Sequence, residues 1–375
     1  MRPASLPLAR PAARPAATRD STRPLTAGFY VNWDDNSYAS FAAHAAQLDW
    51  VICEWSFVAA GGDSLRFAPD RRIPYVIQQL APADRPLIFA MVSNFDSATK
   101  RFDSRDLRRL LATADSRARA VTQLDLFVRR FGLGGVTLDF ESLPPDLDDE
   151  VLEFVRGLRA ALGEHGALVT QALGTDVSDG WLRRFGDAND DVFLMLYDEH
   201  YGGGDVGPVA SQGWYAERVR HAMRLLDPAR TILAIGAYGY DWNDAGPDAS
   251  GSEMTFQDVM AAARDHRSRV VFDPVALNPY ITWTDPDSTD HVAWYLDAAT
   301  AYNQALVGDA AGAAGRAVWR LGSEDPALWR VIGRGARMPP ATGLATIPAG
   351  YDVEFDGDGE ILHLAAEPTD GARVV

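Results

Sequence analysis

The chain has 375 residues, of which 47% are hydrophobic and 23% are charged. This length and composition suit one large domain or two ordinary ones, and they exclude a globally disordered chain. A formal net charge of −17 argues against nucleic acid or an anionic membrane surface as the main partner. Cys53 is the single cysteine, so the chain forms no internal disulfide.

The sequence motifs of common metal and nucleotide sites are missing. The seven histidines are scattered, with no HExxH pair and no Cys/His cluster, and no GxGxxG or GxxxxGK[ST] loop occurs. We therefore expect no metal site and no cofactor. The ten tryptophans and twelve tyrosines are a positive signal, because aromatic faces stack on sugar rings as well as filling cores.

Residues 1–26 are rich in Arg, Pro and Ala and contain no long apolar run. We interpret them as a disordered lead-in or a linker rather than a signal peptide or a membrane span. From Thr26 onward, β-prone apolar runs alternate with segments of helical periodicity. The runs cover 28–33, 50–57, 87–94, 135–141, 168–173, 192–197, 232–238 and 317–321, and the helical patterns include 39–48, 73–80, 117–131, 149–162 and 214–226.

Eight apolar strands that alternate with helices predict a parallel sheet with both faces covered. Eight such units in roughly 300 residues fit a closed (β/α)8 TIM barrel better than an open sheet. The long interval between the seventh and eighth runs, 242–316, predicts an insertion on the side where loops shape an active site. In it we expect helices over 255–264 and 291–306, with a Tyr/Trp-rich stretch over 278–283.

The pattern changes after Trp329. Residues 338–348 are rich in Pro, Ala and Thr, which is typical of a linker. Residues 351–355 and 360–365 alternate around an Asp-Gly-Asp-Gly turn, which predicts a short C-terminal β-hairpin. The expected organisation is therefore a lead-in over 1–26, a barrel over 27–337, and a linker with a hairpin over 338–375.

The fourth run, Gly-Val-Thr-Leu-Asp-Phe-Glu at 135–141, has the strongest chemical signal. Side chains alternate along a strand, so Thr137, Asp139 and Glu141 share one face, and the two carboxyls lie roughly 7 Å apart along the backbone. Proximity and burial raise one pKa, which leaves a protonated carboxyl available near neutral pH. A strand that ends in solvated acids is the alternative, but polar groups at the carboxyl ends of barrel strands face the active site.

Other strand ends supply matching groups. They are Tyr30, Asn32, Trp33 and Asp34 on the first strand, Glu54 on the second, Asn94 on the third, Gln171 on the fifth, Tyr197 and Asp198 on the sixth, Tyr238 on the seventh and Trp319 on the eighth. Together they describe an aromatic-lined cleft around several carboxylates, which is typical of a sugar site.

At these strings the chain resembles glycoside hydrolase family 18, the chitinase family. Residues 135–141 are similar to the DGxDxDxE signature, Met-Leu-Tyr-Asp at 195–198 resembles the MxYD motif, and Trp319 stands at the family's strand-eight tryptophan. Residues 197–201 and 238–242 resemble the branch with spore-cortex and cell-wall N-acetylglucosaminidases. Residues 28–34 and the terminal hairpin resemble modules fused to polysaccharide deacetylases. The resemblance covers about 27–330, although Gly134 and Thr137 replace the first two aspartates of the signature.

The resemblance implies a substrate-assisted, retaining hydrolysis, in which the 2-acetamido oxygen of the substrate is the nucleophile. It implies that Glu141 is the acid and then the base, that Asp139 orients the acetamide and stabilises the oxazolinium, and that Tyr197 donates a hydrogen bond to the acetamide. The predicted substrate-binding residues are Trp319 as the floor, Asp198, Tyr30, Asn94, Tyr238, Trp33 and Glu54.

The implied partner is an N-acetylhexosamine polysaccharide or oligosaccharide, such as chitin, peptidoglycan glycan or an exopolysaccharide. A deacetylase is expected as a fused or neighbouring module, and the substrate class points to the cell envelope or the extracellular space. Two functions of another kind stay open: a non-catalytic chitinase-like sugar-binding module, and a scaffold domain that holds a polymer for a neighbour. Thr137 keeps both open, whereas the presence of Glu141 favours catalysis.

Overall fold

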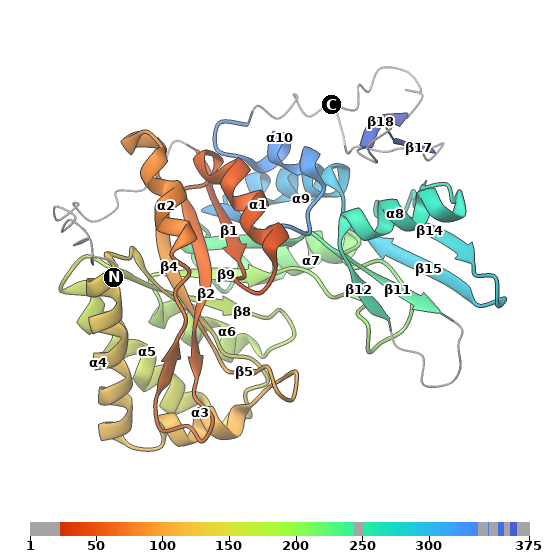
Figure 1. Cartoon of the computed structure of the whole chain (residues 1–375). Helices are drawn as coiled ribbons and strands as arrows, with labels where there is room; N and C mark the ends of the chain where they lie inside the picture. The colour runs from red at the N-terminus through yellow and green to blue at the C-terminus, as the bar shows by residue number, and fades with distance from the viewer. Residues whose placement is uncertain (1–22, 244–250, 337–343, 345–351, 356–360, 366–375) are drawn as a thin grey trace, which may run out of the picture.

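The computed structural model describes residues 23–243, 251–336 and 344, together with the backbone of 352–355 and 361–365 (Figure 1). Its centre is a closed barrel of eight parallel strands, as predicted. In order around the barrel the strands are β1 (Leu25–Tyr30), β2 (Trp50–Val58), β4 (Leu87–Ser93), β7 (Gly135–Asp139), β8 (Leu168–Leu173), β9 (Asp191–Met195), β10 (Thr231–Gly236) and β16 (Gly315–Trp319), which pairs with β1.

Helices cover the outside of the barrel. Several begin at side-chain caps; Ser178 and Ser211, for example, each accept a backbone N–H from the third residue of the helix that follows. The helices are α1 (Asp35–His44), α2 (Arg72–Gln79), α3 (Ser104–Leu111), α4 (Ala114–Phe131), α5 (Asp148–Gly163), α6 (Asp179–Ala188), α7 (Gln212–Ala222), α9 (Ala298–Ala310) and α10 (Trp329–Ile332). Short strands β3 (Leu65–Phe67), β5 (Phe95–Asp96) and β6 (Arg101–Phe102) extend the loops after β2 and β4.

Side chains along each barrel strand alternate between the barrel interior and the layer under the helices. On β1, Phe29 belongs to the interior cluster, whereas Tyr30 belongs to the cluster between strands and helices. On β7, Leu138 lies in the outer cluster. The same alternation therefore turns Thr137 and Asp139 toward the interior.

The insertion between β10 and β16 is a small α/β unit that projects from the barrel (right side of Figure 1). Its core includes Val259, Ile281 and Tyr295. Five antiparallel strands pair in the order β12-β11-β15-β14-β13 beside one helix. Their bounds are β11 (Gly239–Asn243), β12 (Ser252–Met254), α8 (Phe256–His266), β13 (Val271–Phe272), β14 (Pro279–Thr284) and β15 (Asp290–Tyr295).

The expected helix over 291–306 is wrong in its first part. Residues Asp290–Tyr295 form β15, which pairs with both β11 and β14. The helix α9 begins only after Asp297, whose carboxylate accepts the N–H of Thr300. The aromatic and β-branched residues before this cap suit a sheet with two neighbours, so tertiary pairing decides the structure.

The predicted C-terminal hairpin is confirmed at the level of the backbone, because β17 (Asp352–Phe355) pairs antiparallel with β18 (Ile361–Ala365). The backbone of β17 lies close to α8. β1 begins at Leu25, inside the predicted lead-in. Residues 1–22 and most of the predicted linker lie outside the described residues, so the domain boundaries stay predictions. Of the helices that are described, none has the length and apolarity needed to cross a membrane.

Candidate active site

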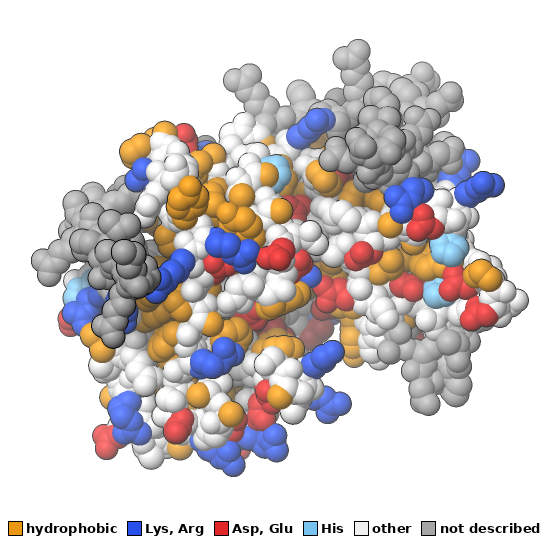
Figure 2. Space-filling model, viewed as in Figure 1, with side chains coloured by type: hydrophobic (Ala, Val, Ile, Leu, Met, Phe, Trp, Pro, Cys, Tyr) orange, Lys and Arg blue, Asp and Glu red, His pale blue; other side chains and the backbone are white. Residues whose placement is uncertain are grey.

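The carboxyl ends of the barrel strands meet at a mouth beside the insertion. Figure 2 shows acidic side chains gathered around a depression between the barrel and the insertion. At this mouth β7 ends at Asp139. Glu141 lies in the loop that follows, whereas the sequence predicted it on the same strand as Asp139. A hydrogen bond nevertheless joins the two carboxyl groups, so the structure brings the predicted pair together.

This carboxyl pair has an environment that favours a bound proton. Asp139 is buried and also receives a hydrogen bond from Ser93 at the end of β4. Burial raises the pKa of both carboxyls, and the negative charges of Asp139 and Asp198 raise the pKa of Glu141 further. Among the described residues, no Lys, Arg or His forms an ion pair with either group. This environment therefore favours a proton bound to the pair.

Asn94 positions Glu141 through the main chain. Its amide Nδ2 donates to the Glu141 carbonyl oxygen at 3.0 Å, and its Oδ1 accepts the Glu141 N–H at 2.9 Å. The side chain is only 3% exposed, which leaves it no surface for a substrate. Asn94 thus lies at the site, but as a clamp on the loop that carries the acid rather than as a sugar ligand.

A second group of side chains surrounds Asp198, which follows β9. Its Oδ1 accepts hydrogen bonds from the Tyr238 hydroxyl at 2.5 Å and the Tyr240 hydroxyl at 3.1 Å. Tyr240 lies on β11 of the insertion and was not among the predicted site residues. Burial and the charges of Glu141, Asp198 and Asp139 raise the pKa of Tyr197 well above its ordinary value. Its hydroxyl therefore stays a proton donor beside the carboxyl pair.

Trp319 ends β16 and is half-buried. Its ring meets Phe29 of the barrel interior edge to face, with 5.4 Å between the centroids. It also packs against the cluster that contains Tyr238. The peptide bond from Trp319 to Arg320 is cis. This position, on top of the interior cluster and beside Tyr197, suits the predicted floor of a sugar site.

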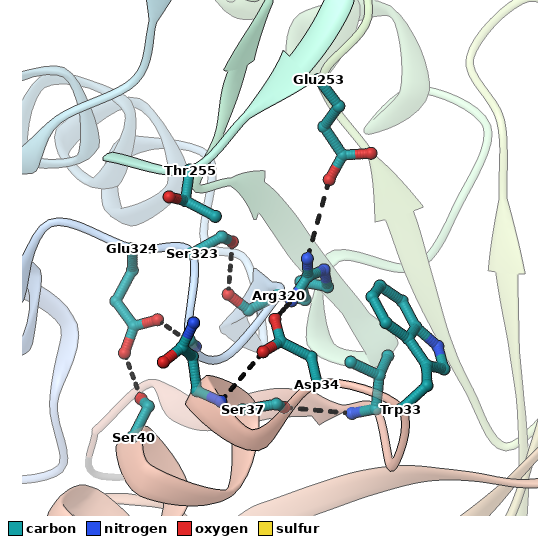
Figure 3. Close-up of polar contacts among 12 residues, drawn as sticks. Trp33, Asp34, Ser37, Ser40, Glu253, Thr255, Arg320, Ser323 and Glu324 are labelled. Atoms are coloured by element: carbon teal, nitrogen blue, oxygen red, sulfur yellow. Dashed lines mark hydrogen bonds and ion pairs between the residues drawn. The ribbon is translucent and has the colours of Figure 1, made fainter. Parts of the chain in front are cut away.

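Trp33 and Glu54 form a separate wall of the mouth with Arg320, which was not among the predicted site residues. Figure 3 shows Trp33 beside Arg320, which lies between Asp34 and Glu253. The Trp33 indole is 65% exposed, but its Nε1 donates to Glu54 at 2.8 Å and the Arg320 guanidinium lies 4.5 Å from its ring centroid. Arg320 is buried and pairs with Asp34 at 2.5 Å and with Glu253 of the insertion at 3.9 Å. An exposed ring that buried charged groups hold in place is suited to contact a ligand.

Glu54 is buried, and its pKa is raised to about 7. Burial is the main cause, and the charge of Asp139 acts in the same direction. The hydrogen bond from Trp33 and the charge of Arg320 act in the opposite direction. Glu54 therefore supports Trp33 and lies within the field of the carboxyl pair.

Tyr30 is not brought to the mouth. It is fully buried in the outer layer, and its hydroxyl donates to Asp70 at 2.5 Å. The prediction that it contacts substrate is wrong, because neighbouring residues on a strand face opposite sides and Phe29 occupies the interior face. In the described ranges, no three His, Cys, Asp or Glu side chains are grouped to hold a metal ion.

A carboxyl pair at the mouth of a TIM barrel, among aromatic rings, defines a glycoside hydrolase. The model for "Glycosyl hydrolases family 18" matches residues 26–324, and the chain belongs to this family. The uncharacterized glycosylase YvbX of Bacillus subtilis is 23% identical over 322 residues, which cover 84% of this chain and 92% of that protein. The cortical fragment-lytic enzyme of Bacillus subtilis is 22% identical, and the match covers 68% of this chain and 62% of that protein.

Solved structures show the same fold. A chitinase from Chromobacterium violaceum superimposes with a TM-score of 0.74 at 22% identity, covering 84% of this chain and 100% of that chain. The spore cortex-lytic enzyme SleL of Bacillus cereus gives a TM-score of 0.72 at 18% identity, covering 82% of this chain and 73% of that chain.

Proposed function

We propose that this protein hydrolyses glycosidic bonds in an N-acetylglucosamine-containing polysaccharide by a substrate-assisted, retaining mechanism. The observation that supports this most is the Asp139–Glu141 pair, whose carboxyls share a hydrogen bond while burial raises both pKa values. Chitinases and cortex-lytic enzymes among the similar proteins support the substrate class. A cell-envelope or extracellular location and a neighbouring deacetylase belong to this proposal as well.

In the first step Glu141, in its acid form, gives its proton to the leaving glycosidic oxygen. The acetamide oxygen of the substrate attacks the anomeric carbon as the glycosidic bond breaks, which forms an oxazolinium. In the second step a water molecule attacks the same carbon and Glu141 takes its proton. The retained anomer is released and Glu141 is again an acid.

The neighbouring groups act on the acetamide and on the charge that develops. Asp139 supplies a negative charge that offsets the positive oxazolinium, and Ser93 holds its carboxyl in place. The Tyr197 hydroxyl donates a hydrogen bond to the acetamide, Asp198 contacts the same sugar, and Trp319 forms the apolar floor. Trp33 extends the aromatic surface on its side of the mouth.

One observation favours the alternative of a sugar-binding or scaffold module. Thr137, at the position of a family aspartate, is buried, and its hydroxyl pairs with the Thr170 hydroxyl at 2.8 Å. No carboxyl at 137 is therefore present to share a proton with Asp139. Ser93 still acts on Asp139 as a hydrogen-bond partner, which supports the hydrolase proposal in the absence of that aspartate.

Release of reducing ends from the N-acetylglucosamine tetramer tests the proposal. We expect release from this tetramer and none from the fully deacetylated tetramer, since the latter lacks the acetamide nucleophile. Calorimetric binding of the acetylated tetramer without any release would favour the sugar-binding module instead.

A further inference from the structure

A pocket of about 350 Å³ opens beside Glu141, on the side of the mouth formed by β7, β8 and β9. Glu141 and Leu143 line it from the loop after β7, Met195 from the end of β9, and Val177 and Trp181 from the segment after β8. Its volume is in the range of sites that hold small ligands. We call it the leaving-side pocket, after the leaving-group side of the scissile bond.

The lining of this pocket gives its direction relative to the scissile bond. Glu141 is part of the wall, whereas Asp139, Tyr197 and Trp319, the groups proposed to hold the acetamide sugar, are not. A polymer that places its acetamide sugar on Trp319 and its scissile oxygen at Glu141 therefore continues into this pocket with its next sugar. Trp33 is on the opposite side of the mouth from this pocket, because it lies near β1, β2 and β16, across the barrel from β8.

Trp181 is a fixed aromatic wall of the pocket. Its Nε1 donates to Asp148 Oδ1 at 3.0 Å, and its ring stacks on Phe185 with 4.0 Å between the centroids. Its backbone N–H is held by the Ser178 cap at 3.2 Å. A ring held by a hydrogen bond and a stacking contact, on a capped backbone, loses little conformational freedom when a sugar packs against it.

The ionisable side chains that line the pocket are all acidic. They are the carboxyls of Glu141 and Asp148, and the lining contains no Lys, Arg or His among the described residues. Outside the lining, α6 carries Arg183 and Arg184 at exposed positions, and Arg184 pairs with Asp149. A carboxylate on a bound sugar would face the acids of the lining with no positive partner in that lining.

We propose that the leaving-side pocket binds the sugar on the leaving-group side of the scissile bond, with Trp181 as its stacking surface, and that it selects uncharged or cationic sugars against sugars that carry a carboxylate. The direction of the pocket rests on the proposed function, whereas its affinity for a sugar does not. The selected polymers would be chitin-like or partly deacetylated chains rather than glycans with acidic substituents.

The first test concerns charge. Two substrates are compared, an alternating tetrasaccharide in which the sugar after each N-acetylglucosamine carries a lactyl carboxylate, and its lactyl amide of the same size. We expect kcat/KM to be about tenfold higher for the lactyl amide substrate than for the lactyl carboxylate. Asp148→Asn should reduce this difference in kcat/KM, because it removes one negative charge from the pocket while its side-chain oxygen can still accept the hydrogen bond from Trp181. Equal rates, or a preference for the carboxylate, would overturn the selection.

The second test concerns Trp181. Trp181→Ala should lower kcat/KM for the N-acetylglucosamine tetramer about 5- to 100-fold, by analogy with other stacking surfaces, and Trp181→Phe should restore part of it. The loss should be smaller for the β-fluoride of the N-acetylglucosamine disaccharide, whose leaving group does not fill the pocket. A matched control is Trp283→Ala, because the Trp283 indole is likewise held by Asp285 at 3.1 Å and stacks on His291, but in the insertion. If the two alanine variants behaved alike on both substrates, Trp181 would have no role in binding.

Calorimetric binding to Glu141→Gln separates this proposal from the proposed function. If the wild-type protein cleaves nothing, but Trp181→Ala in the Glu141→Gln background weakens tetramer binding, the hydrolase proposal fails and the sugar pocket stands. If the wild-type protein cleaves the tetramer with no effect of Trp181 or of the carboxylate, the pocket assignment fails and the hydrolase stands.

Discussion

Carboxyl groups gather on two sides of the barrel mouth, and among the described residues only one of these sides has a cation paired with them. Asp34 and Glu253 face the buried guanidinium of Arg320. Asp139 and Glu141 have each other, with no described cation paired to either. The first arrangement stabilises the charged form of the carboxylates and holds Trp33 in place. The second favours a protonated carboxyl. Among the described residues, the absence of a cation, more than the presence of acids, distinguishes the side of the mouth that we propose as the reacting one.

Glu141→Gln should have the largest effect, because the amide keeps the shape of the side chain but has no proton to transfer to the leaving group. We expect kcat to fall about 10²–10⁴-fold while tetramer binding stays nearly intact. Reducing-end release and calorimetry measure the two quantities. Full activity in this variant would remove Glu141 from the role of the acid.

Asp139→Asn should be comparably harmful and should also move the pH profile. In the proposed mechanism activity requires protonated Glu141, so activity should fall as pH rises through the pKa of that group. The charge of Asp139 is one cause of the raised pKa of Glu141, and its removal lowers that pKa. The alkaline limb of kcat/KM should therefore shift to lower pH, and an unchanged limb would contradict the coupling of the pair.

On the other side of the mouth, Arg320→Met should destabilise the fold by about 3–5 kcal/mol, since it leaves the Asp34 carboxyl, which is only 15% exposed, without its cation. Arg316→Met is the matched control on the same strand, because its partner Asp309 is 43% exposed and can be hydrated. Urea unfolding should show the larger loss for Arg320→Met. Equal losses would mean that the Arg320 cluster is no more than an ordinary ion pair.

Asn94→Ala should cost about 2–4 kcal/mol of stability, because it leaves two main-chain groups of Glu141 without partners. Asn278 provides a control, since it holds the Ala210 carbonyl oxygen at 2.9 Å and the Ala210 N–H at 3.2 Å in the same manner. We expect both alanine variants to lose similar stability, and kcat to fall, by about tenfold, only in Asn94→Ala. An equal fall in kcat for Asn278→Ala would argue against a positioning role.

Glu54→Gln should have the smallest effect, on the pH dependence of stability. Its pKa is raised from an ordinary 4.5 to about 7 in the folded protein, so the unfolded chain loses this proton first as pH rises. Stability therefore falls between about pH 4.5 and 7, by on the order of 3 kcal/mol. The glutamine variant should flatten this part of the thermal unfolding profile while its amide oxygen still accepts from Trp33. A slope equal to that of the wild type would show that Glu54 does not titrate there.

The sequence predicted the barrel because its strands are buried on both faces and read as continuous apolar runs. It predicted the carboxyl pair because strand ends in such a barrel converge on one mouth. Tyr30 was misplaced because a strand end was treated as one unit, although alternation from Phe29 would have turned it outward. Arg320 was missed because a lone Arg after a strand has no pattern; only the fold brings Asp34 and Glu253 to it.

The boundary between β15 and α9 in the insertion could not be predicted from the sequence. Residues 290–307, which cover β15 and most of α9, contain no Gly or Pro, so no breaker separated strand from helix. The cap at Asp297 was the available signal, and it lay within an apolar stretch that also fits a helix. Pairing of β15 with two neighbours, which no local pattern shows, decided the outcome.

The most direct test of the account is the anomeric configuration of the first product, followed by NMR during cleavage of the N-acetylglucosamine tetramer. Attack by the acetamide oxygen and then by water inverts the anomeric carbon twice, so the account predicts a first-formed product with the β configuration of the substrate. A first-formed α anomer would contradict it, because a single displacement by water would then have replaced the substrate's own nucleophile.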